Sequence, residues 1–125
     1  MAAKTPEQLH TLFAEAYNAG DLEKLVDLYE KDAVLVPAPG TEARGIDAIR
    51  TALGGFLGVK GTMALDTRWS LVEGDTALLS GAWTLSGATG PDGKPMDLAG
   101  KTTEVARRGA DGAWRYYIDN PNGAD

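Results

Sequence analysis

The sequence contains no cysteine, and this absence removes several chemistries at once. Disulfides, thiolate nucleophiles and cysteine-ligated metals are all excluded. The chain also has a single histidine, His10. Carboxylates without supporting histidine or cysteine could bind only hard cations, and no carboxylate cluster here has ligand spacing. We therefore expect no metal site.

Basic residues are also scarce, with 12 Lys and Arg against 18 Asp and Glu and a net charge of -6. Nucleic-acid binding needs clustered basic side chains, and Arg107-Arg108 is the only adjacent pair, so no nucleic-acid partner is expected. No apolar run approaches the length of a membrane span, and the N-terminus lacks a signal-peptide pattern. We expect a cytoplasmic protein with no membrane contact.

The residues that are present describe an ordinary globular chain. At 125 residues, with 43% hydrophobic and 24% charged residues, the sequence is long enough for one core and too short for two. We expect a single domain spanning residues 1–125.

The first half has helical periodicity. Thr5 and Pro6 predict a helix start, and an apolar stripe follows at Leu9, Leu12, Phe13, Ala16 and Tyr17. Ala19-Gly20 ends this helix, and Asp21 caps a second whose apolar positions are Leu22, Leu25, Val26 and Tyr29. A third helix is predicted from about Asp47, although Gly54-Gly55 weakens it.

Strand periodicity appears in one short segment of the first half and again from Thr62 onward. The short strand at 33–36 ends at Pro37 and is followed by a loop over 38–45. Longer strands are predicted at about 62–72, 75–88, 97–108 and 113–120, separated by turn sequences. Short connections between consecutive strands predict an antiparallel meander, and the fold class is α+β. Neither face of the strand from Thr76 carries charge, so we expect both faces to be covered. Three helices cannot cover both faces of the sheet, and we therefore expect a second copy of the protein to cover the other face, forming a homodimer through the sheet.

The last strand, residues 114–119, concentrates aromatic and carboxylate side chains. Strict alternation would place Trp114, Tyr116 and Ile118 on one face and Arg115, Tyr117 and Asp119 on the other. A single β-bulge would exchange Asp119 with Ile118.

Several short motifs resemble those of a known family. They are Thr5-Pro6-Glu7, Asn18-Ala19-Gly20-Asp21-Leu22, Asp32-Ala33-Val34, Arg44-Gly45 and Ala48-Ile49-Arg50. They are similar to ketosteroid isomerases and polyketide-cyclase-like (SnoaL-like) proteins of the nuclear transport factor 2-like superfamily. The resemblance implies a cone of curved antiparallel sheet, with four long strands and one short, wrapped around three N-terminal helices. It also implies a pocket for a small apolar ligand and no cofactor.

The resemblance places the isomerase roles on three positions. In ketosteroid isomerases an Asp moves the proton while a Tyr and a protonated Asp hydrogen-bond the enolate oxygen. Those positions fall on Pro37, Phe13 and Glu104 in this sequence. Because Phe and Pro cannot fill the first two roles, the usual isomerase mechanism is not expected.

Asp119 and Glu104 are the candidate catalytic residues. The resemblance implies that the face carrying Asp119 and Tyr117 lines the cavity, where a buried carboxyl group would have a raised pKa. The structural alternatives are that Asp119 pairs with Arg115 or with a neighbouring strand, or caps the Asn120-Pro121 turn, and that Glu104 pairs with Arg115 or Arg68.

The expected ligand-binding residues are Phe13, Tyr17, Phe56 and Tyr117, with the two phenols as polar contacts. The alternative is that they belong to the ordinary core. Trp83 and Trp114 are assigned to packing or to the dimer face. His10, at the edge of the first helix's stripe, is expected to be solvated, with a pocket role as the alternative.

Three functions remain open. The first is a cofactor-free acid–base isomerase, cyclase or dehydratase acting on an oxygenated apolar substrate. The second is a carrier or sensor of a small hydrophobic ligand. The third is a dimeric association domain without enzymatic activity.

Overall fold

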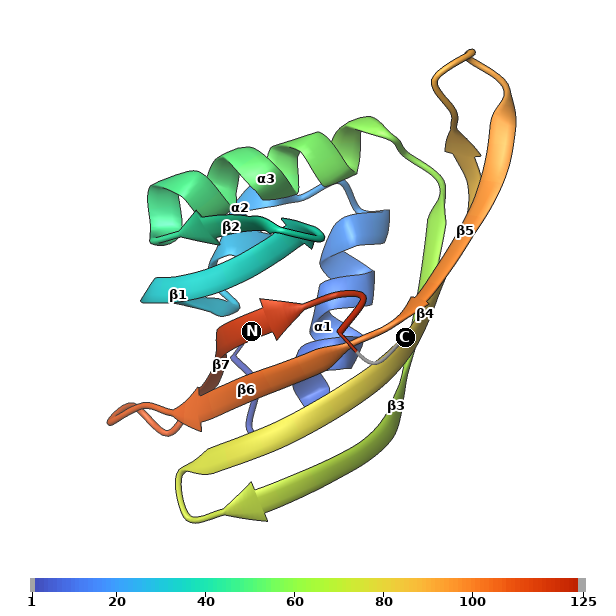
Figure 1. Cartoon of the computed structure of the whole chain (residues 1–125). Coiled ribbons are helices and arrows are strands. Elements are labelled where there is room, and N and C mark those ends of the chain that lie inside the picture. The colour runs from blue at the N-terminus through green and yellow to red at the C-terminus, as the bar shows by residue number, and fades with distance from the viewer. Residues whose placement is uncertain (1, 124–125) are drawn as a thin grey trace.

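Three helices pack inside the curve of a seven-stranded sheet in the computed structural model, which describes residues 2–123 (Figure 1). The helices are α1 (Gln8–Asn18), α2 (Leu22–Val26) and α3 (Ile46–Gly58). The strands are β1 (Tyr29–Ala38), β2 (Thr41–Arg44), β3 (Thr62–Glu73), β4 (Thr76–Thr89), β5 (Pro95–Lys101), β6 (Thr103–Arg108) and β7 (Trp114–Asn120). This arrangement confirms the predicted α+β fold with a curved sheet.

Helix α1 buries the stripe that its periodicity predicts. Leu9, Phe13, Ala16 and Tyr17 are buried against the sheet and the other helices. The helix begins at Gln8, later than predicted, because residues 5–7 form a turn. In that turn the Gln8 side chain accepts a hydrogen bond from the backbone of Lys4 at 2.7 Å.

Strands β1 and β2 correct the predicted loop. Tyr29 begins β1 instead of extending α2, and β1 continues through Pro37 and pairs antiparallel with β2. The β1–β2 register shifts between Leu35 and Ala38. Pro37 lies in that shift, where its missing N–H removes no regular ladder bond. The other edge of β1 pairs parallel with β7, so the sheet is mixed and not fully antiparallel.

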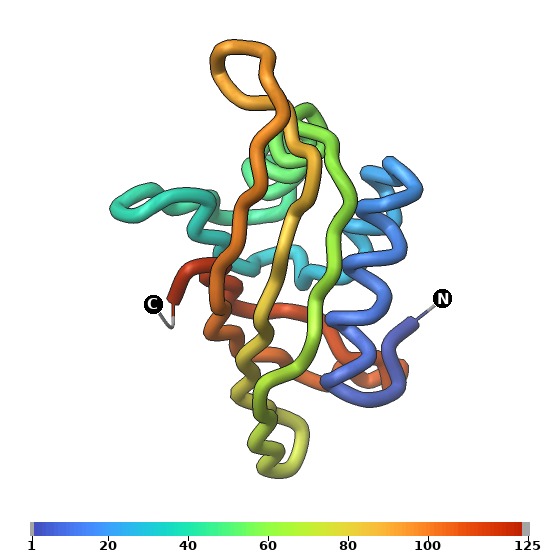
Figure 2. The backbone as a smooth tube through the Cα atoms, turned by 90° about the vertical axis from the view of Figure 1, so that its right-hand side faces the viewer, coloured from blue at the N-terminus to red at the C-terminus, as the bar shows by residue number. Residues whose placement is uncertain are grey.

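The predicted strand over 97–108 is two strands, β5 and β6, that pair with different parts of β4. The division falls at Thr102, whose backbone N–H donates to the Gly81 carbonyl at 2.8 Å. Its hydroxyl accepts from the Gly81 N–H at 2.7 Å. A side chain thus replaces a backbone partner at this point. Figure 2 shows β3, β4 and β5 running side by side along the molecule, with the 90–94 turn at one end.

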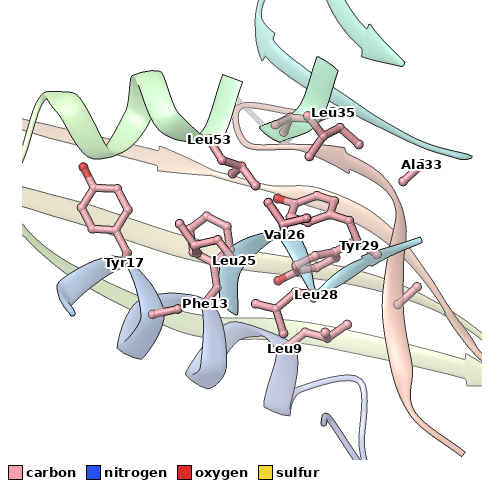
Figure 3. Packing of buried hydrophobic residues seen from close by; sticks show 14 of the residues in the cluster. Leu9, Phe13, Tyr17, Leu25, Val26, Leu28, Tyr29, Ala33, Leu35 and Leu53 are labelled. Carbon is pink, nitrogen blue, oxygen red and sulfur yellow. The ribbon is translucent and has the colours of Figure 1, made fainter. Parts of the chain in front are cut away.

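The core fills the space between the helices and the inner face of the sheet. Leu9, Leu25, Leu35 and Leu53 are fully buried there, each stabilising the fold by about 1.5–3 kcal/mol. Figure 3 shows Leu53 of α3 directed toward Leu25 and Val26, with Phe13 and Tyr17 along α1. Toward one end, the layer between α1, α3 and the sheet opens into a cavity.

Candidate functional site

The cavity has a volume of about 260 Å³, close to the lower end of the ~300–1,000 Å³ usual for small-molecule sites. Its wall is contributed by α1, α3, six strands and the segment after β7, and most of it is apolar. It is lined by Phe13, Tyr17, Pro37, Phe56, Val59, Met63, Leu65, Trp83, Leu85, Leu98, Thr102, Glu104, Tyr116, Asp119, Pro121 and Asn122. Two carboxyl groups therefore face an otherwise largely hydrophobic space.

The two carboxyl groups are neighbours on adjacent strands. Glu104 of β6 and Asp119 of β7 are register partners, with exposed fractions of 2% and 4%. Asp119 reaches the cavity because the β6–β7 register shifts between Val105 and Ala106. This irregularity leaves Ile118 on the outer face, 40% exposed. Asp119 consequently shares its face with Tyr116, and not with Tyr117 as strict alternation predicts.

Asp119 is held by one phenol. The Tyr29 hydroxyl donates a hydrogen bond of 2.5 Å to its Oδ2 atom. Burial, and to a lesser extent the charge of Glu104, raise the pKa of Asp119 to about 8, although the Tyr29 hydrogen bond acts to lower it. Asp119 is therefore largely protonated at neutral pH, and a protonated carboxyl group can donate a hydrogen bond to a ligand oxygen.

Glu104 is held by the only histidine of the sequence. His10 Nε2 lies 2.7 Å from Glu104 Oε1, and His10 Nδ1 lies 2.7 Å from Thr67 Oγ1. His10 is 1% exposed, so the expectation that it is solvated is wrong. The ring is buried because β3 packs against α1 and Glu104 of β6 contacts the ring.

Tyr116 supplies a third polar group to the cavity. It is 1% exposed, and within residues 2–123 its hydroxyl makes no hydrogen bond. Burial raises the pKa of Tyr116 well above its usual value, and the charges of Glu104 and Asp119 raise it further. A buried hydroxyl without a partner is uncommon in folded proteins, and here it lines a space that a ligand could fill.

Three of the four expected ligand-binding residues line the cavity: Phe13, Tyr17 and Phe56. The Tyr17 hydroxyl is already engaged, since it donates to the carbonyls of Phe56 at 2.7 Å and Lys60 at 3.0 Å. Tyr17 thus satisfies the C-terminal end of α3 and contributes its ring to the wall.

Tyr117 does not line the cavity. The Arg107 guanidinium lies 3.6 Å from the centre of its ring, a cation–π contact away from the cavity. The expectation for Tyr117 fails because of the same bulge that brings Asp119 inward. Sequence reasoning therefore selected the wrong phenol of the adjacent pair, Tyr117 instead of Tyr116.

Of the structural alternatives for the two carboxyl groups, one is observed: Asp119 contacts a neighbouring strand, since Tyr29 lies on β1, which pairs with β7. The predicted pairings with arginine are not observed. Arg115 pairs with Asp111 at 2.8 Å, which holds the pKa of Asp111 at about 2. Arg68 donates to the Ser80 hydroxyl at 2.9 Å. Arg68 and Arg115 therefore contact neither Glu104 nor Asp119.

Trp83 combines packing with a position on the cavity wall. Its indole N–H donates to the Pro121 carbonyl at 2.8 Å, which fixes the segment after β7. Trp114 is buried in the core. Among residues 2–123, no group of three or more His, Cys, Asp or Glu could hold a metal ion. No helix in the same range is long and apolar enough to cross a membrane.

Comparison with solved structures finds the same fold repeatedly. A ketosteroid isomerase-like protein from Erwinia carotovora atroseptica is 24% identical with a TM-score of 0.79, over 91% of this chain and 89% of that one. A nuclear transport factor 2-like superfamily protein from Salmonella enterica is 16% identical with a TM-score of 0.75, over 91% and 84%. A candidate calcium/calmodulin dependent protein kinase II association domain from Xanthomonas campestris is 23% identical with a TM-score of 0.72, over 94% and 85%.

These identities establish the fold and not the activity, and no curated protein matches the sequence. The sequence itself carries the family assignment. Residues 10–117 match the model of the SnoaL-like domain, which covers most of the chain. This range contains α2, α3, most of α1, Glu104 and most of the cavity wall, and it ends two residues before Asp119. The chain therefore belongs to the SnoaL-like domain family.

Proposed function

We propose that this protein binds a small, mostly apolar molecule that carries an oxygen atom, and that Asp119 and Glu104 exchange protons with it without a cofactor. One observation carries the proposal: two carboxyl groups, each at least 96% buried, lie side by side in a largely apolar cavity. Burying ionisable groups costs several kcal/mol, on the order expected from desolvation. If the two positions served only to pack the core, apolar residues there would give a more stable fold than carboxyl groups do.

The environments of the two carboxyl groups favour different roles. Asp119, with a pKa of about 8, is the acid that donates to the ligand oxygen. The Tyr116 hydroxyl can supply a second donor to the same oxygen. Glu104, supported by His10, is the base that accepts a proton from a neighbouring carbon. Pairs of titratable groups in contrasting environments often divide the work in this way.

The charge of the cavity narrows the ligand class. No Lys, Arg or His side chain is among the lining residues, whereas two carboxyl groups are. An anionic ligand would be repelled and would find no counter-ion, so we propose a neutral molecule. Isomerisation, cyclisation and dehydration all fit, because each removes a proton at one atom and places one on an oxygen.

The test begins with a binding screen of neutral oxygenated hydrophobic compounds, followed by turnover assays on the compounds that bind. Asp119→Asn and Glu104→Gln keep side-chain size and remove the titrating groups. We expect each to lower turnover by about 10²–10⁴-fold, the range for general acid–base catalysis. Turnover unchanged in both variants would contradict the catalytic proposal.

A carrier function is the second candidate, and a specific observation favours it. Phe13 and Pro37, at the positions where ketosteroid isomerases have their Tyr and basic Asp, both lie on the cavity wall. The wall there is chemically inert. A carrier would bind its ligand in both carboxyl variants and would convert it in none. If no neutral compound binds, the association-domain hypothesis gains support.

We also propose that the protein is a homodimer that pairs through the outer face of its sheet. Leu71, Leu78, Val105 and Ile118 are successive register partners across β3, β4, β6 and β7, and we name them the apolar row. Leu71, Leu78 and Ile118 are 66%, 38% and 40% exposed. In Figure 1 the helices lie on the other side of the sheet. A row of exposed aliphatic side chains is typical of an interface.

A further inference from the structure

The Thr67–His10–Glu104 chain joins solvent to the cavity. Thr67 is exposed on β3, while His10 and Glu104 are 1% and 2% exposed. Two contacts of 2.7 Å link the three side chains through the two ring nitrogens of His10. A neutral imidazole accepts a hydrogen bond at one nitrogen and donates at the other, so it can pass a proton between partners on opposite sides.

The fold leaves space for the imidazole at Gly81. A Cβ atom at this position would lie 3.2 Å from both Cε1 and Nε2 of His10 and 2.8 Å from Leu65 Cδ1. A side chain on β4 would therefore push against the ring. The absence of a Cβ at Gly81 leaves room for the ring, whose two nitrogens lie within hydrogen-bond distance of Thr67 and Glu104.

The charged side chain that contacts the ring is acidic, and so is the neighbour of that side chain on the next strand. Glu104 on β6 contacts the ring directly, and Asp119 on β7 lies beside Glu104. Glu7, the residue just before α1, accepts a hydrogen bond from Ser70 on β3, which lowers the pKa of Glu7. Arg68, next to Thr67 in sequence, contacts Ser80 instead. Nothing basic competes with His10 for the Glu104 carboxylate among these neighbours.

We propose that Thr67, His10 and Glu104 form a proton relay that exchanges protons between the cavity carboxyl group and solvent. This role rests on the proton exchange proposed for Glu104 above. In the loading direction, the Thr67 hydroxyl passes its proton to His10 Nδ1 and takes one from a solvent water, which is left as hydroxide. His10 Nε2 passes its proton to the Glu104 carboxylate. One proton enters from water, one arrives on Glu104, and the imidazole ends neutral in its other tautomer.

The reverse sequence unloads Glu104 after it has taken a proton from a ligand. Glu104 is too deeply buried to reach water directly, and a bound ligand would cover its cavity side. The relay therefore allows a turnover cycle to close while the cavity stays occupied. His10 and Thr67 act as positioning and relay residues, since neither lines the cavity.

A direct test uses the fact that the sequence contains one histidine. Selective ¹⁵N labelling of histidine gives a single imidazole in the NMR spectrum, and the exchange of its ring N–H proton with water can be measured without any ligand. We expect Thr67→Val, which keeps the shape and removes the hydroxyl, to slow this exchange at least about tenfold, because exchange must then wait for local opening. Thr67→Ser restores the hydroxyl and should exchange at nearly the wild-type rate.

The tautomer supplies a second readout. In the wild type, the ring proton should lie on Nε2, which faces Glu104 Oε1, because the Thr67 hydroxyl donates to Nδ1. Glu104→Gln should weaken this preference, because its amide can donate to Nε2 as well as accept from it. Equal exchange rates in wild type and Thr67→Val, or a ring proton found on Nδ1 in the wild type, would overturn the relay.

These outcomes separate the relay from the proposed function. If ligand binding depends on Asp119 but the exchange of the His10 ring proton is the same with and without the Thr67 hydroxyl, the relay is refuted and the proposed function stands. Exchange that depends on Thr67, together with a cavity that takes no neutral ligand, would uphold the relay and refute the small-molecule function.

Discussion

Asp119 keeps its proton in a pH range where ordinary carboxyl groups have lost theirs. Its pKa rises from 3.8 to about 8 because the site is desolvated and Glu104 lies beside it. Below pH 4 the group is protonated in both the folded and unfolded states. Between pH 4 and 8 the unfolded chain releases the proton and the folded chain holds it. As the pH rises through this window, Asp119 should therefore lower the free energy of unfolding by up to about 1.4 kcal/mol per pH unit.

Asp119→Asn has no proton to lose, and its amide oxygen can still accept from Tyr29. We expect its free energy of unfolding to lack the part of the decline between pH 4 and 8 that Asp119 contributes, which chemical denaturation at a series of pH values would measure. Asp111, whose pKa is about 2 through its contact with Arg115, provides the control. Asp111→Asn should leave the wild-type slope above pH 4 unchanged. The same slope in wild type and Asp119→Asn would contradict the assignment.

Two neighbouring phenols should respond differently to the loss of their hydroxyl groups. The rings of Tyr29 and Tyr116 lie 5.2 Å apart, but only Tyr29 has a hydrogen-bond partner among residues 2–123. Tyr29→Phe leaves Asp119 without its donor and should cost about 1–3 kcal/mol. Tyr116→Phe removes an unpaired buried hydroxyl and should cost less than Tyr29→Phe or stabilise the fold. Urea unfolding of the two variants measures both effects, and equal losses would contradict the contrast.

Sequence reasoning found the two carboxyl groups but not their partners. Asp119 and Glu104 are conspicuous in the sequence because burying a charged residue on a core-packing strand costs free energy, which suggests a functional role. Tyr116 and Tyr29 do not stand out, since a tyrosine in an apolar pattern is usually core packing. His10 had only its edge position on α1 as a signal, and its two partners lie 57 and 94 residues away in sequence. Such contacts follow from the tertiary fold and not from local pattern.

At the scale of elements, helix α3 is destabilised by two glycines in its interior. Gly54 and Gly55 lie in its interior, and an added Cβ would meet nothing within 4 Å at either position. We expect Gly55→Ala to stabilise the protein by about 0.5–1 kcal/mol, because alanine loses less backbone entropy on folding into a helix. Thermal or urea unfolding would measure the gain.

Gly61 provides the matched control, because its φ of +87° lies in the left-handed region and an added Cβ would lie 2.9 Å from the Ser86 carbonyl oxygen. Gly61→Ala should destabilise the fold by at least about 1 kcal/mol. A loss of stability in Gly55→Ala would mean that α3 requires glycine for a reason beyond its own backbone.

Elements with strong periodicity were predictable, and elements that depend on partners were not. The α1 stripe, the Asp21 cap and the order of the long strands follow from local sequence. The Asp21 carboxylate accepts from the Lys24 backbone at 3.1 Å as predicted. Strand β2 was missed because residues 41–44 carry no strand signal of their own. The parallel β1–β7 pairing was missed because it joins two segments that lie far apart in the sequence. The division between β5 and β6 depends on the contacts of Thr102 with Gly81.

At the scale of the whole molecule, the two faces of the sheet have different tasks. The inner face carries Leu79, Glu104 and Asp119 toward the helices and the cavity. The outer face carries the apolar row, which no helix covers in the described part of the chain (Figure 1). Because side chains alternate along a strand, the same strands can serve a ligand site and an interface without sharing residues.

The homodimer proposal can be tested on one strand with two adjacent residues. Leu71 belongs to the apolar row, whereas Val72 is 51% exposed and pairs with the buried Ala77 on the opposite face. We expect light scattering after size exclusion to give the mass of two chains for the wild type and for Val72→Glu. Leu71→Glu should give one chain, because a carboxylate would be buried without a partner at the interface. A single-chain mass for the wild type at high micromolar concentration would refute the dimer, and a monomeric Leu71→Glu that still binds ligand would show that the cavity works within one chain.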